Sequence, residues 1–360
     1  MKEINHAALL DKITFGGIYI VDIKDIDMLI NSEVIEKSTT KVNYVTAEGQ
    51  IFSRLMIDHD GVIDKMIAGA KVMGGKKINY CTLELTVKGK IANLNCCTVE
   101  QYTEKLYQIQ RHLEEEYGII VDFSCLTIKE MEINKTFKLQ EDFCKYHRVI
   151  NLIMQNLPYY LCSQMDYKKV KDEGSEHETY YATSAKSRKS KRYLLFKIYN
   201  KTKALENLIV LTDSYMRVEI KLVGAEKIKS ALDTNLFFEL KDVTINQYFD
   251  EQMNKLIIEP TNKWKQSRDK QVLRLMKDER KRDIRHWQTN VLRILQNEEI
   301  IRKRAVVLDI EEITSLVDSL DLKANRKSDI KKNFRKQAKK YETAFCNQDN
   351  IKLDEIISKL

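Results

Sequence analysis

The stretch Tyr180–Leu222 decides how the middle of the chain folds; it reads YYATSAKSRKSKRYLLFKIYNKTKALENLIVLTDSYMRVEIKL. Apolar and polar residues alternate in Tyr193–Lys201 and again in Ser214–Val223, and this pattern predicts two β-strands. The more polar residues before them, 168–192, predict a hairpin or a loop. Glu219 lies between two apolar residues of the second predicted strand. The stretch therefore predicts adjacent strands that carry a basic loop at one end.

Further helices and strands surround these two strands. Apolar residues recur at helical spacing in Val99–Gly118, and Gly118 is typical of the end of a helix. Further strands are expected at Ile13–Val21, at Lys77–Lys88 and within Ile119–Phe137, and further helices at Gln140–Leu157 and Ala225–Leu232. This order predicts an α+β fold in which helices pack on one face of an antiparallel sheet.

The composition changes near Pro260. All 11 glycines lie at or before Gly224, and the second of the 2 prolines is Pro260 itself. The residues that follow are rich in helix-forming side chains, so we expect an all-helical C-terminal domain. The predicted regions are an N-terminal segment at 1–70, an α+β domain at 71–260 and a helical domain at 261–360.

Two helical features are expected in the last hundred residues. The first is a long helix over Asn262–Arg304 with one break near Asn290. The second is a helix-turn-helix formed by Ile310–Leu320 and Ser328–Tyr341, with Ser328 as the N-cap of its second helix.

Positive charge is concentrated in two places. The formal net charge is +8, and the excess lies in 261–360 because the rest of the chain is close to neutral. Within that rest, Ala185–Ala204 is basic and contains no acidic residue. Clustered basic side chains are typical of phosphate binding, although solvated helix faces carry them too. We expect contacts with double-stranded and single-stranded DNA from Lys186, Arg188, Lys189, Lys191 and Arg192, and from Lys331, Lys332, Arg335 and Lys336, whose helix is equally compatible with a recognition helix and a plain surface helix.

The compartment can also be predicted. The sequence contains no apolar run of about eighteen residues and no N-terminal secretory signal. Its 7 cysteines are scattered, and no CxxC pair occurs. We therefore expect a cytoplasmic protein with reduced thiols and no membrane partner. Motifs for nucleotide binding, for serine hydrolases and for zinc or His-pair metal sites are absent from the sequence.

Three glutamates lie in predicted strands between apolar neighbours: Glu84, Glu132 and Glu219. A carboxylate on a half-buried strand is costly unless it is paired or bound to a metal. Three of them on one sheet could hold Mg²⁺ or Mn²⁺, which prefer oxygen ligands, and Asn134 would share a strand face with Glu132. The alternative is that each glutamate points outward on the polar face of its strand.

Tyr199 is the candidate nucleophile. Lys197 and Lys201 flank it on the same predicted strand face, which would place positive charge on both sides of the hydroxyl. A phenol has a pKa near 10, so its attack on phosphorus needs help. A metal ion that polarises the phosphate and a lysine that lowers the pKa of the phenol would supply that help. The rival candidates are Tyr180, Tyr181 and Tyr193, and most tyrosines in a chain are packing residues.

These blocks resemble the rolling-circle replication initiators of small Gram-positive plasmids. The sequence FKIYNK around Tyr199 resembles the family's RIYNK block, whose tyrosine is the nicking nucleophile. Arg217-Val218-Glu219 matches its RVE block, and Glu130-Met131-Glu132 and Thr82-Leu83-Glu84-Leu85 resemble its two earlier acidic strands. The replication proteins of filamentous phages and some relaxases of conjugative elements are similar in the same blocks.

The resemblance implies a metal-dependent nickase and strand transferase that acts on origin DNA through a 5′-phosphotyrosyl intermediate. Tyr199 and Lys201 would be catalytic, while Glu132, Glu219 and Glu84 would hold Mg²⁺ or Mn²⁺. Region 71–260 would be the nicking domain, and 261–360 would bind duplex DNA or a second subunit. A homodimer and a host helicase are further implied partners. Two alternatives stay open, namely a conjugative relaxase with the same chemistry and a DNA-binding initiator or repressor without catalysis.

Overall fold

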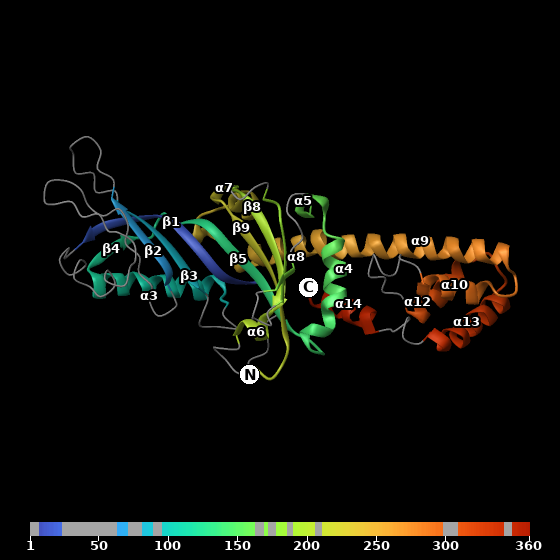
Figure 1. The fold of residues 1–360 in the computed structure, drawn as a ribbon. Helices are drawn as coiled ribbons and strands as arrows, with labels where there is room; N and C mark the ends of the chain where they lie inside the picture. The colour runs from blue at the N-terminus through green and yellow to red at the C-terminus, as the bar shows by residue number, and fades with distance from the viewer. Residues whose placement is uncertain are drawn as a thin grey trace. The chain divides into compact units, whose positions relative to one another are not determined.

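The computed structural model describes residues 7–23, 63–70, 81–88, 96–162, 169–171, 178–185, 190–205, 211–297, 309–341 and 348–360. The chain forms two compact units (Figure 1). The sheet unit comprises Met1–Lys138 and Ser163–Asp250, and the helical unit comprises Leu139–Cys162 and Glu251–Leu360. Each unit is therefore assembled from two separate segments of the sequence.

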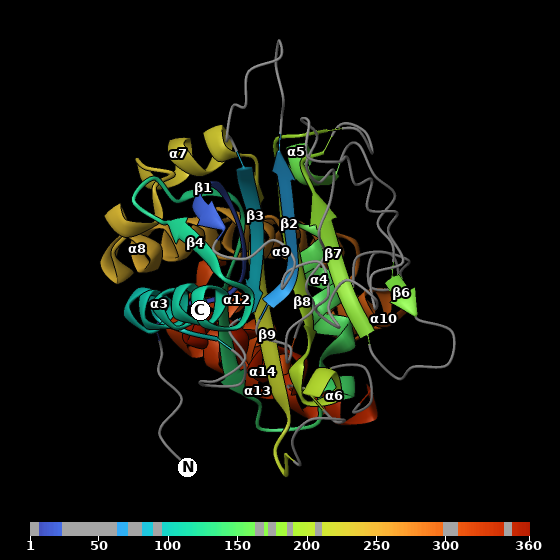
Figure 2. The ribbon, with the colours of Figure 1, turned by 90° about the vertical axis from the view of Figure 1, so that its left-hand side faces the viewer.

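The described strands of the sheet unit form one antiparallel sheet, part of which is seen in Figure 2. Their order is β2-β3-β1-β5-β9-β8-β7-β6, and β4 pairs with β1. The strands are β1 (Leu9–Ile23), β2 (Ile63–Ala70), β3 (Cys81–Lys88), β4 (Ile119–Asp122), β5 (Thr127–Lys138), β6 (Lys169–Lys171), β7 (Glu178–Thr183), β8 (Tyr193–Asn200) and β9 (Tyr215–Val223). The two strands predicted from Tyr180–Leu222 are thus confirmed as β8 and β9, which pair with each other. The predicted hairpin or loop at 168–192 includes two further strands, β6 and β7.

Alternation along β5 and β9 separates an apolar face from a polar one. On β5 the side chains of Met131 and Ile133 are fully buried, whereas Glu132 lies between them on the other face. On β9, Val218 and Ile220 are buried on the apolar face, and the opposite face carries the charged side chains of Arg217, Glu219 and Lys221. The apolar face forms the core of the unit, so the other face is left to carry charged groups.

Strand β1 keeps its apolar residues on the core face through a β-bulge. Leu10 pairs with Ile133, but Ile13 pairs with Met131, so two residues of β1 lie opposite Glu132. A bulge adds one residue to one strand, and here it restores the apolar register after an Asp-Lys pair. Leu10 and Ile13 are consequently both fully buried.

A second irregularity of β1 needs glycine. Gly17 has φ +69°, a conformation that residues with a side chain rarely adopt. A Cβ atom there would lie 2.8 Å from the backbone oxygen of Cys125. The strand can therefore bend at this point and pair with β5 before the bend and with β4 after it.

Helix α3 (Val99–Tyr117) confirms the helical periodicity of the sequence. Its start is fixed by a capping box, in which the side chain of Thr98 accepts from the backbone of Gln101 and the side chain of Gln101 accepts from the backbone of Thr98. Its end is Gly118, which adopts the left-handed conformation as predicted. The other α-helices described in the sheet unit are α6 (Lys201–Leu205), α7 (Ala225–Leu232) and most of α8 (Asp242–Met253).

The helical unit has a core of its own. Trp287, Val291, Ile313 and Phe334 meet there, and the rings of Trp287 and Phe334 pack edge to face. The unit is built from the helices α4 (His147–Gln155), α5 (Tyr159–Cys162), α9 (Glu259–Arg282), α10 (Trp287–Asn297), α12 (Ile310–Leu316), α13 (Ala324–Ala338) and α14 (Gln348–Lys359), with short 3₁₀ turns at Phe143–Tyr146, Val317–Ser319 and Lys339–Tyr341 and a π-turn at Asn254–Ile258. The α+β class followed by a helical C-terminal region is therefore confirmed.

Details of the helical prediction differ from the structure. The division falls between Asp250 and Glu251, and Pro260 lies in the first turn of α9, where proline does not interrupt a helix. The predicted helix Gln140–Leu157 begins later, as a 3₁₀ turn followed by α4.

The long predicted helix and the predicted helix-turn-helix also differ from the helices in the structure. The break comes at Asp283, whose side chain accepts from the backbone of Arg285 and His286, and Asn290 lies inside α10. Ser328 lies within α13 and does not cap it. The capped helix is α12, where Asp309 and Glu312 form a capping box. No helix among the described residues is both long enough and apolar enough to cross a membrane.

Candidate metal and nucleophile site

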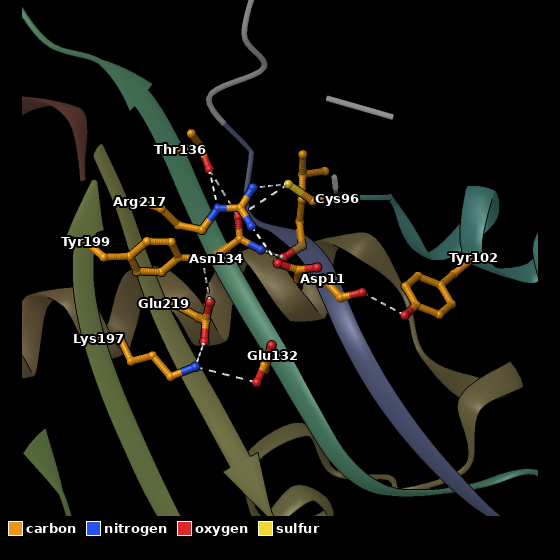
Figure 3. A network of polar contacts seen from close by, with 11 residues as sticks. Asp11, Cys96, Tyr102, Glu132, Asn134, Thr136, Lys197, Tyr199, Arg217 and Glu219 are labelled. Atoms are coloured by element: carbon orange, nitrogen blue, oxygen red, sulfur yellow. Dashed lines mark hydrogen bonds and ion pairs between the residues drawn. The ribbon is translucent and has the colours of Figure 1, made fainter. Parts of the chain in front are cut away.

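The polar face of four adjacent strands carries the candidate site (Figure 3). Asn134 of β5 lies opposite Glu219 of β9, and Glu219 lies opposite Lys197 of β8. One step along, Arg217 of β9 lies opposite Tyr199 of β8. Residues directly opposite each other in a sheet share a face, so the register gathers these side chains on one side.

Three carboxylates meet on this face. Asp11, Glu132 and Glu219 each offer an oxygen, and these oxygens all lie within 4.8 Å of one another. Their side chains are 18%, 13% and 2% exposed, so the group is largely screened from water but remains reachable. Hard divalent cations bind several carboxylate oxygens in such an arrangement, and the donor set fits Mg²⁺ or Mn²⁺.

Crowding and burial perturb the pKa values of two of these carboxylates. Burial raises the pKa of Asp11, and the nearby Arg217 only partly opposes the effect. Burial also raises the pKa of Glu132, and the negative charge of Glu219 raises it further. Both shifts have the direction expected where negative charge is gathered in a partly dry site.

Tyr199 contacts this cluster directly. Its hydroxyl donates a hydrogen bond to Oε2 of Glu219 over 3.1 Å. Burial raises the pKa of Tyr199 well above 10, Arg217 opposes this, and Glu219 adds to it. The expectation that a neighbouring lysine lowers the pKa of the phenol is therefore wrong, because desolvation disfavours the phenolate more than the nearby cations stabilise it.

Lys201 lies beside Tyr199, but not on its strand. Strand β8 ends at Asn200, and Lys201 begins α6, with its Nζ atom 6.0 Å from the centre of the Tyr199 ring. The residue is 5% exposed. Burial, with help from the charge of Arg217, lowers the pKa of Lys201 to about 8. An ammonium group with this pKa can lose its proton near physiological pH.

Lys197 is the cation that touches the carboxylates. Its Nζ lies 2.5 Å from Oε1 of Glu219 and 3.6 Å from Oε1 of Glu132. Burial lowers the pKa of Lys197, but the two carboxylates outweigh burial and hold that pKa above its ordinary value. Lys221, one pair further along β9, bonds mainly to Glu130 over 2.7 Å and reaches Glu132 only over 3.7 Å.

Arg217 holds the other end of the cluster. The residue is completely buried, and its guanidinium donates to Asp11 over 2.6 Å and to Thr136 over 2.7 Å. It also donates to the sulfur of Cys96 over 2.9 Å. The hydroxyl of Tyr102 donates to the backbone oxygen of Asp11 over 2.8 Å. These contacts hold the bulged part of β1 against β5 and β9.

The structure thus brings together Glu132, Glu219, Tyr199 and Lys201 among the predicted site residues. Glu84 is on β3, and its side chain lies outside the described residues. The backbone register places Lys88, rather than Glu84, beside the Asp11 bulge. Four residues of strand separate these two positions, roughly 13 Å at about 3.3 Å per residue. The register therefore favours Asp11 over Glu84 as the third carboxylate.

The rival tyrosines are placed differently. Tyr180 is buried and pairs with Ile198, on the core face of the sheet. Tyr181 pairs with Lys197 and therefore shares the polar face with Tyr199. Tyr193 lies at the far end of β8, opposite Val223. Among these four tyrosines, Tyr199 is the one whose hydroxyl bonds to the carboxylate cluster.

The predicted DNA-contacting residues are only partly described. Lys186, Arg188 and Lys189 lie outside the described residues. Lys191 and Arg192 are exposed, and Arg192 pairs with Glu226. On α13, Lys331 pairs with Asp318 and Arg335 pairs with Glu311. Lys332 and Lys336 are exposed, and neither forms an ion pair with a described residue.

Asp11 is the site residue that the sequence reading missed. It stands in the sequence LLDKITF, where the alternation of a strand fails at Asp11-Lys12. The bulge explains that failure, because an extra residue shifts the period by one. Asp11 follows the apolar Leu10, as the three glutamates follow apolar residues, but Lys12 comes next in place of a second apolar neighbour.

No family model matches the sequence, and no curated protein matches it. Among solved structures, the rolling circle replication initiator protein from Geobacillus stearothermophilus is similar at 12% identity and a TM-score of 0.27. The similarity covers 62% of this chain and 76% of that one, and it is distant.

Proposed function

We propose that this chain is a DNA-nicking enzyme of the replication-initiator kind, with Tyr199 as its nucleophile. The observation that carries the proposal is the hydrogen bond from the Tyr199 hydroxyl to Glu219, a member of the three-carboxylate cluster. A weak nucleophile beside a proton acceptor, next to a site suited to a divalent cation, is the arrangement that attack on a phosphodiester requires.

The proposed reaction is one transesterification. The Tyr199 oxygen forms a bond to phosphorus, and the bond from phosphorus to the 3′-oxygen of the preceding nucleotide breaks. The products are a 5′-phosphotyrosyl bond and a 3′-hydroxyl end. One phosphodiester replaces another, so the reverse step can reseal a strand. The phenol proton passes to Glu219, which already accepts its hydrogen bond. The leaving 3′-oxygen takes up one proton from water and Glu219 returns one proton to water, so no net proton is gained or lost.

Asp11, Glu132 and Glu219 would hold Mg²⁺ or Mn²⁺, which would polarise the phosphate and favour ionisation of the phenol. Because burial raises the pKa of Tyr199, the phenol depends on such help. Lys201 would supply positive charge beside the ring, and the exposed Lys191 would attract the DNA backbone. The helical unit would then contribute duplex binding through α13, or contacts with a second subunit or a helicase.

The proposal is tested on supercoiled DNA that carries the gene's own neighbourhood, with Mn²⁺ or with EDTA. We expect a metal-dependent nick and a nucleotide adduct on the peptide that contains Tyr199, detected by denaturing gel and peptide mapping. Tyr199→Phe should retain DNA binding and lose both the nick and the adduct. Tyr181→Phe is the matched control, since it removes a hydroxyl from the same face of the neighbouring strand.

Two outcomes would contradict the proposal in different ways. Nicking by Tyr199→Phe would show that another residue is the nucleophile. DNA that is bound but never cut, with or without metal, would favour the binding-only initiator or repressor. A conjugative relaxase shares this chemistry, and the neighbouring genes separate it from a replication initiator.

A further inference from the structure

The ammonium of Lys197 lies where a bound divalent metal ion would also lie. Its Nζ contacts one oxygen of Glu219 and one of Glu132, two of the three carboxylates in the cluster. The other oxygen of Glu219 accepts from Tyr199. Both oxygens of the central carboxylate are therefore already engaged by groups of this chain.

A lysine and a divalent cation cannot share these oxygens without cost. A metal ion bound by carboxylates lies about 2.0–2.6 Å from their oxygens. The Nζ atom of Lys197 already contacts the same oxygens, so it occupies the space that the metal ion would need. Two cations at such separation repel each other, and the repulsion is strong where water is largely excluded. Glu219 is 2% exposed, so little water is present to screen this repulsion.

We propose that Lys197 is an internal cation of the carboxylate cluster, which competes with the divalent metal and must withdraw from Glu219 and Glu132 when the metal binds. The inference rests on the proposed function and specifies how its metal site is regulated. The lysine stabilises Glu219 and Glu132 when no metal is bound, and it weakens the affinity of the site for metal.

The position of Lys197 on β8 would link metal binding to DNA binding. Lys197 and Tyr199 are two residues apart on one strand, so both side chains extend from the same face. After withdrawal, the ammonium of Lys197 would remain beside Tyr199. A DNA phosphate bound there would replace the carboxylates as its negatively charged partner. DNA would then favour metal binding, and by reciprocity the metal would favour DNA binding.

Lys221 provides an internal comparison. Its Nζ reaches Glu132 over 3.7 Å, but its principal partner is Glu130, outside the carboxylate cluster. Removing Lys221 should therefore affect metal affinity less than removing Lys197. Lys135 pairs with Asp250 and extends from the opposite face of β5, and it serves as a remote control.

The test is Mn²⁺ binding to the full chain, measured by titration calorimetry without DNA. Lys197→Met should bind Mn²⁺ at least tenfold more tightly than the unmodified chain, whereas Lys135→Met should bind it equally. A phosphodiester oligonucleotide should tighten Mn²⁺ binding to the unmodified chain and should tighten it less in Lys197→Met. Lys197→Gln, with a folded circular dichroism spectrum as the criterion, replaces the methionine variant if that variant does not fold.

The outcomes separate this inference from the proposed function. Unchanged or weaker Mn²⁺ binding in both Lys197 variants, together with loss of binding in Glu219→Gln, would overturn the internal cation and leave the metal site standing. Absence of Mn²⁺ binding in every variant would overturn both. Tighter binding in the Lys197 variants that is lost again when Glu219→Gln is added would support both.

Discussion

Each unit of this protein buries an arginine among acidic residues, and the two arginines do different things. In the helical unit, Arg268 forms two parallel hydrogen bonds to Glu312 and lies over the ring of Trp264. Glu312 also accepts from the side chain of Asn350 and belongs to the capping box of α12. Through Glu312 this group joins α9, α12 and α14 to one another.

In the sheet unit, Arg217 is bound to Asp11, but two more carboxylates stand beside that residue. Two lysines and a tyrosine border the group, and burial raises the pKa of Asp11 and of Glu132. Negative charge is gathered here beyond what one arginine neutralises. Arg268 bonds directly to both of its carboxylates, Glu312 and Asp269, and this arrangement stabilises a fold. Arg217 bonds to only one carboxylate of a crowded group of three, and such a group is a place where a cation can be bound.

The largest expected effect separates Glu219 from Glu312. Glu219→Gln should reduce nicking by on the order of 10²–10³-fold or more, because it removes both the proton acceptor and a metal ligand. Glu312→Gln, which alters the carboxylate bound by Arg268, should leave the nicking rate unchanged. The rates are compared on the same supercoiled substrate with Mn²⁺. Equal losses in the two variants would mean that the two regions do not differ in function.

The second effect concerns stability. Arg268→Met and Arg217→Met should each lower the free energy of unfolding by at most about 3–5 kcal/mol, since each removes a buried arginine and leaves a partly exposed carboxylate without that cation. Mn²⁺ should restore part of the loss in Arg217→Met only, by about 2.7 kcal/mol when its concentration is 100 times its dissociation constant. Urea denaturation with and without Mn²⁺ measures this. Equal restoration of both variants would remove the distinction between the two arginines.

The third effect depends on pH. Burial lowers the pKa of Lys201 to about 8, so charged Lys201 destabilises the folded chain below pH 8. This cost declines as pH rises through 8 and is gone above the unfolded value near 10.5. Lys201→Met should therefore stabilise the chain at pH 7 by roughly 3 kcal/mol at most and make it less active. Denaturation at pH 7 and pH 10 measures the difference, and Lys135→Met is the matched control.

The smallest effect is expected on the surface of α13. Lys332→Ala with Lys336→Ala should leave stability unchanged and reduce the salt dependence of duplex binding by a slope of about 2, if each lysine contacts one phosphate. Arg335→Ala should instead lower stability only slightly, because it breaks an exposed pair with Glu311. Duplex binding measured over a range of salt concentrations tests this. An unchanged slope would indicate that α13 is a plain surface helix.

Strict alternation and capping signals could be interpreted from the sequence alone. Strands β8 and β9 follow from period-two patterns, and Gly118 ends α3 where its conformational freedom predicts. The acidic position of Glu219 between Val218 and Ile220 placed it correctly on the polar face. These features depend on neighbours in sequence, which a single sequence displays.

Features set by distant parts of the chain could not be predicted in the same way. Asp11 joins the site through a bulge whose register is decided by β5, more than a hundred residues later. The pKa of Tyr199 depends on burial, and burial outweighs the positive charge that its neighbours in sequence suggest. The assignment of Leu139–Cys162 to the helical unit likewise depends on helices formed at the other end of the sequence.

The helical unit is assembled from two separate segments of the chain, which are synthesised at different times. Tyr146, just before α4, donates a hydrogen bond to Glu355 of α14, and α4 packs with α14. The ribosome makes α14 roughly 190 residues after α4, a delay of on the order of 10–40 s at ordinary rates of translation. Helix α4, whose apolar residues are buried in the folded unit, must wait that long for this partner. A nascent chain that stalls before α14 would therefore be a substrate for chaperones and proteases.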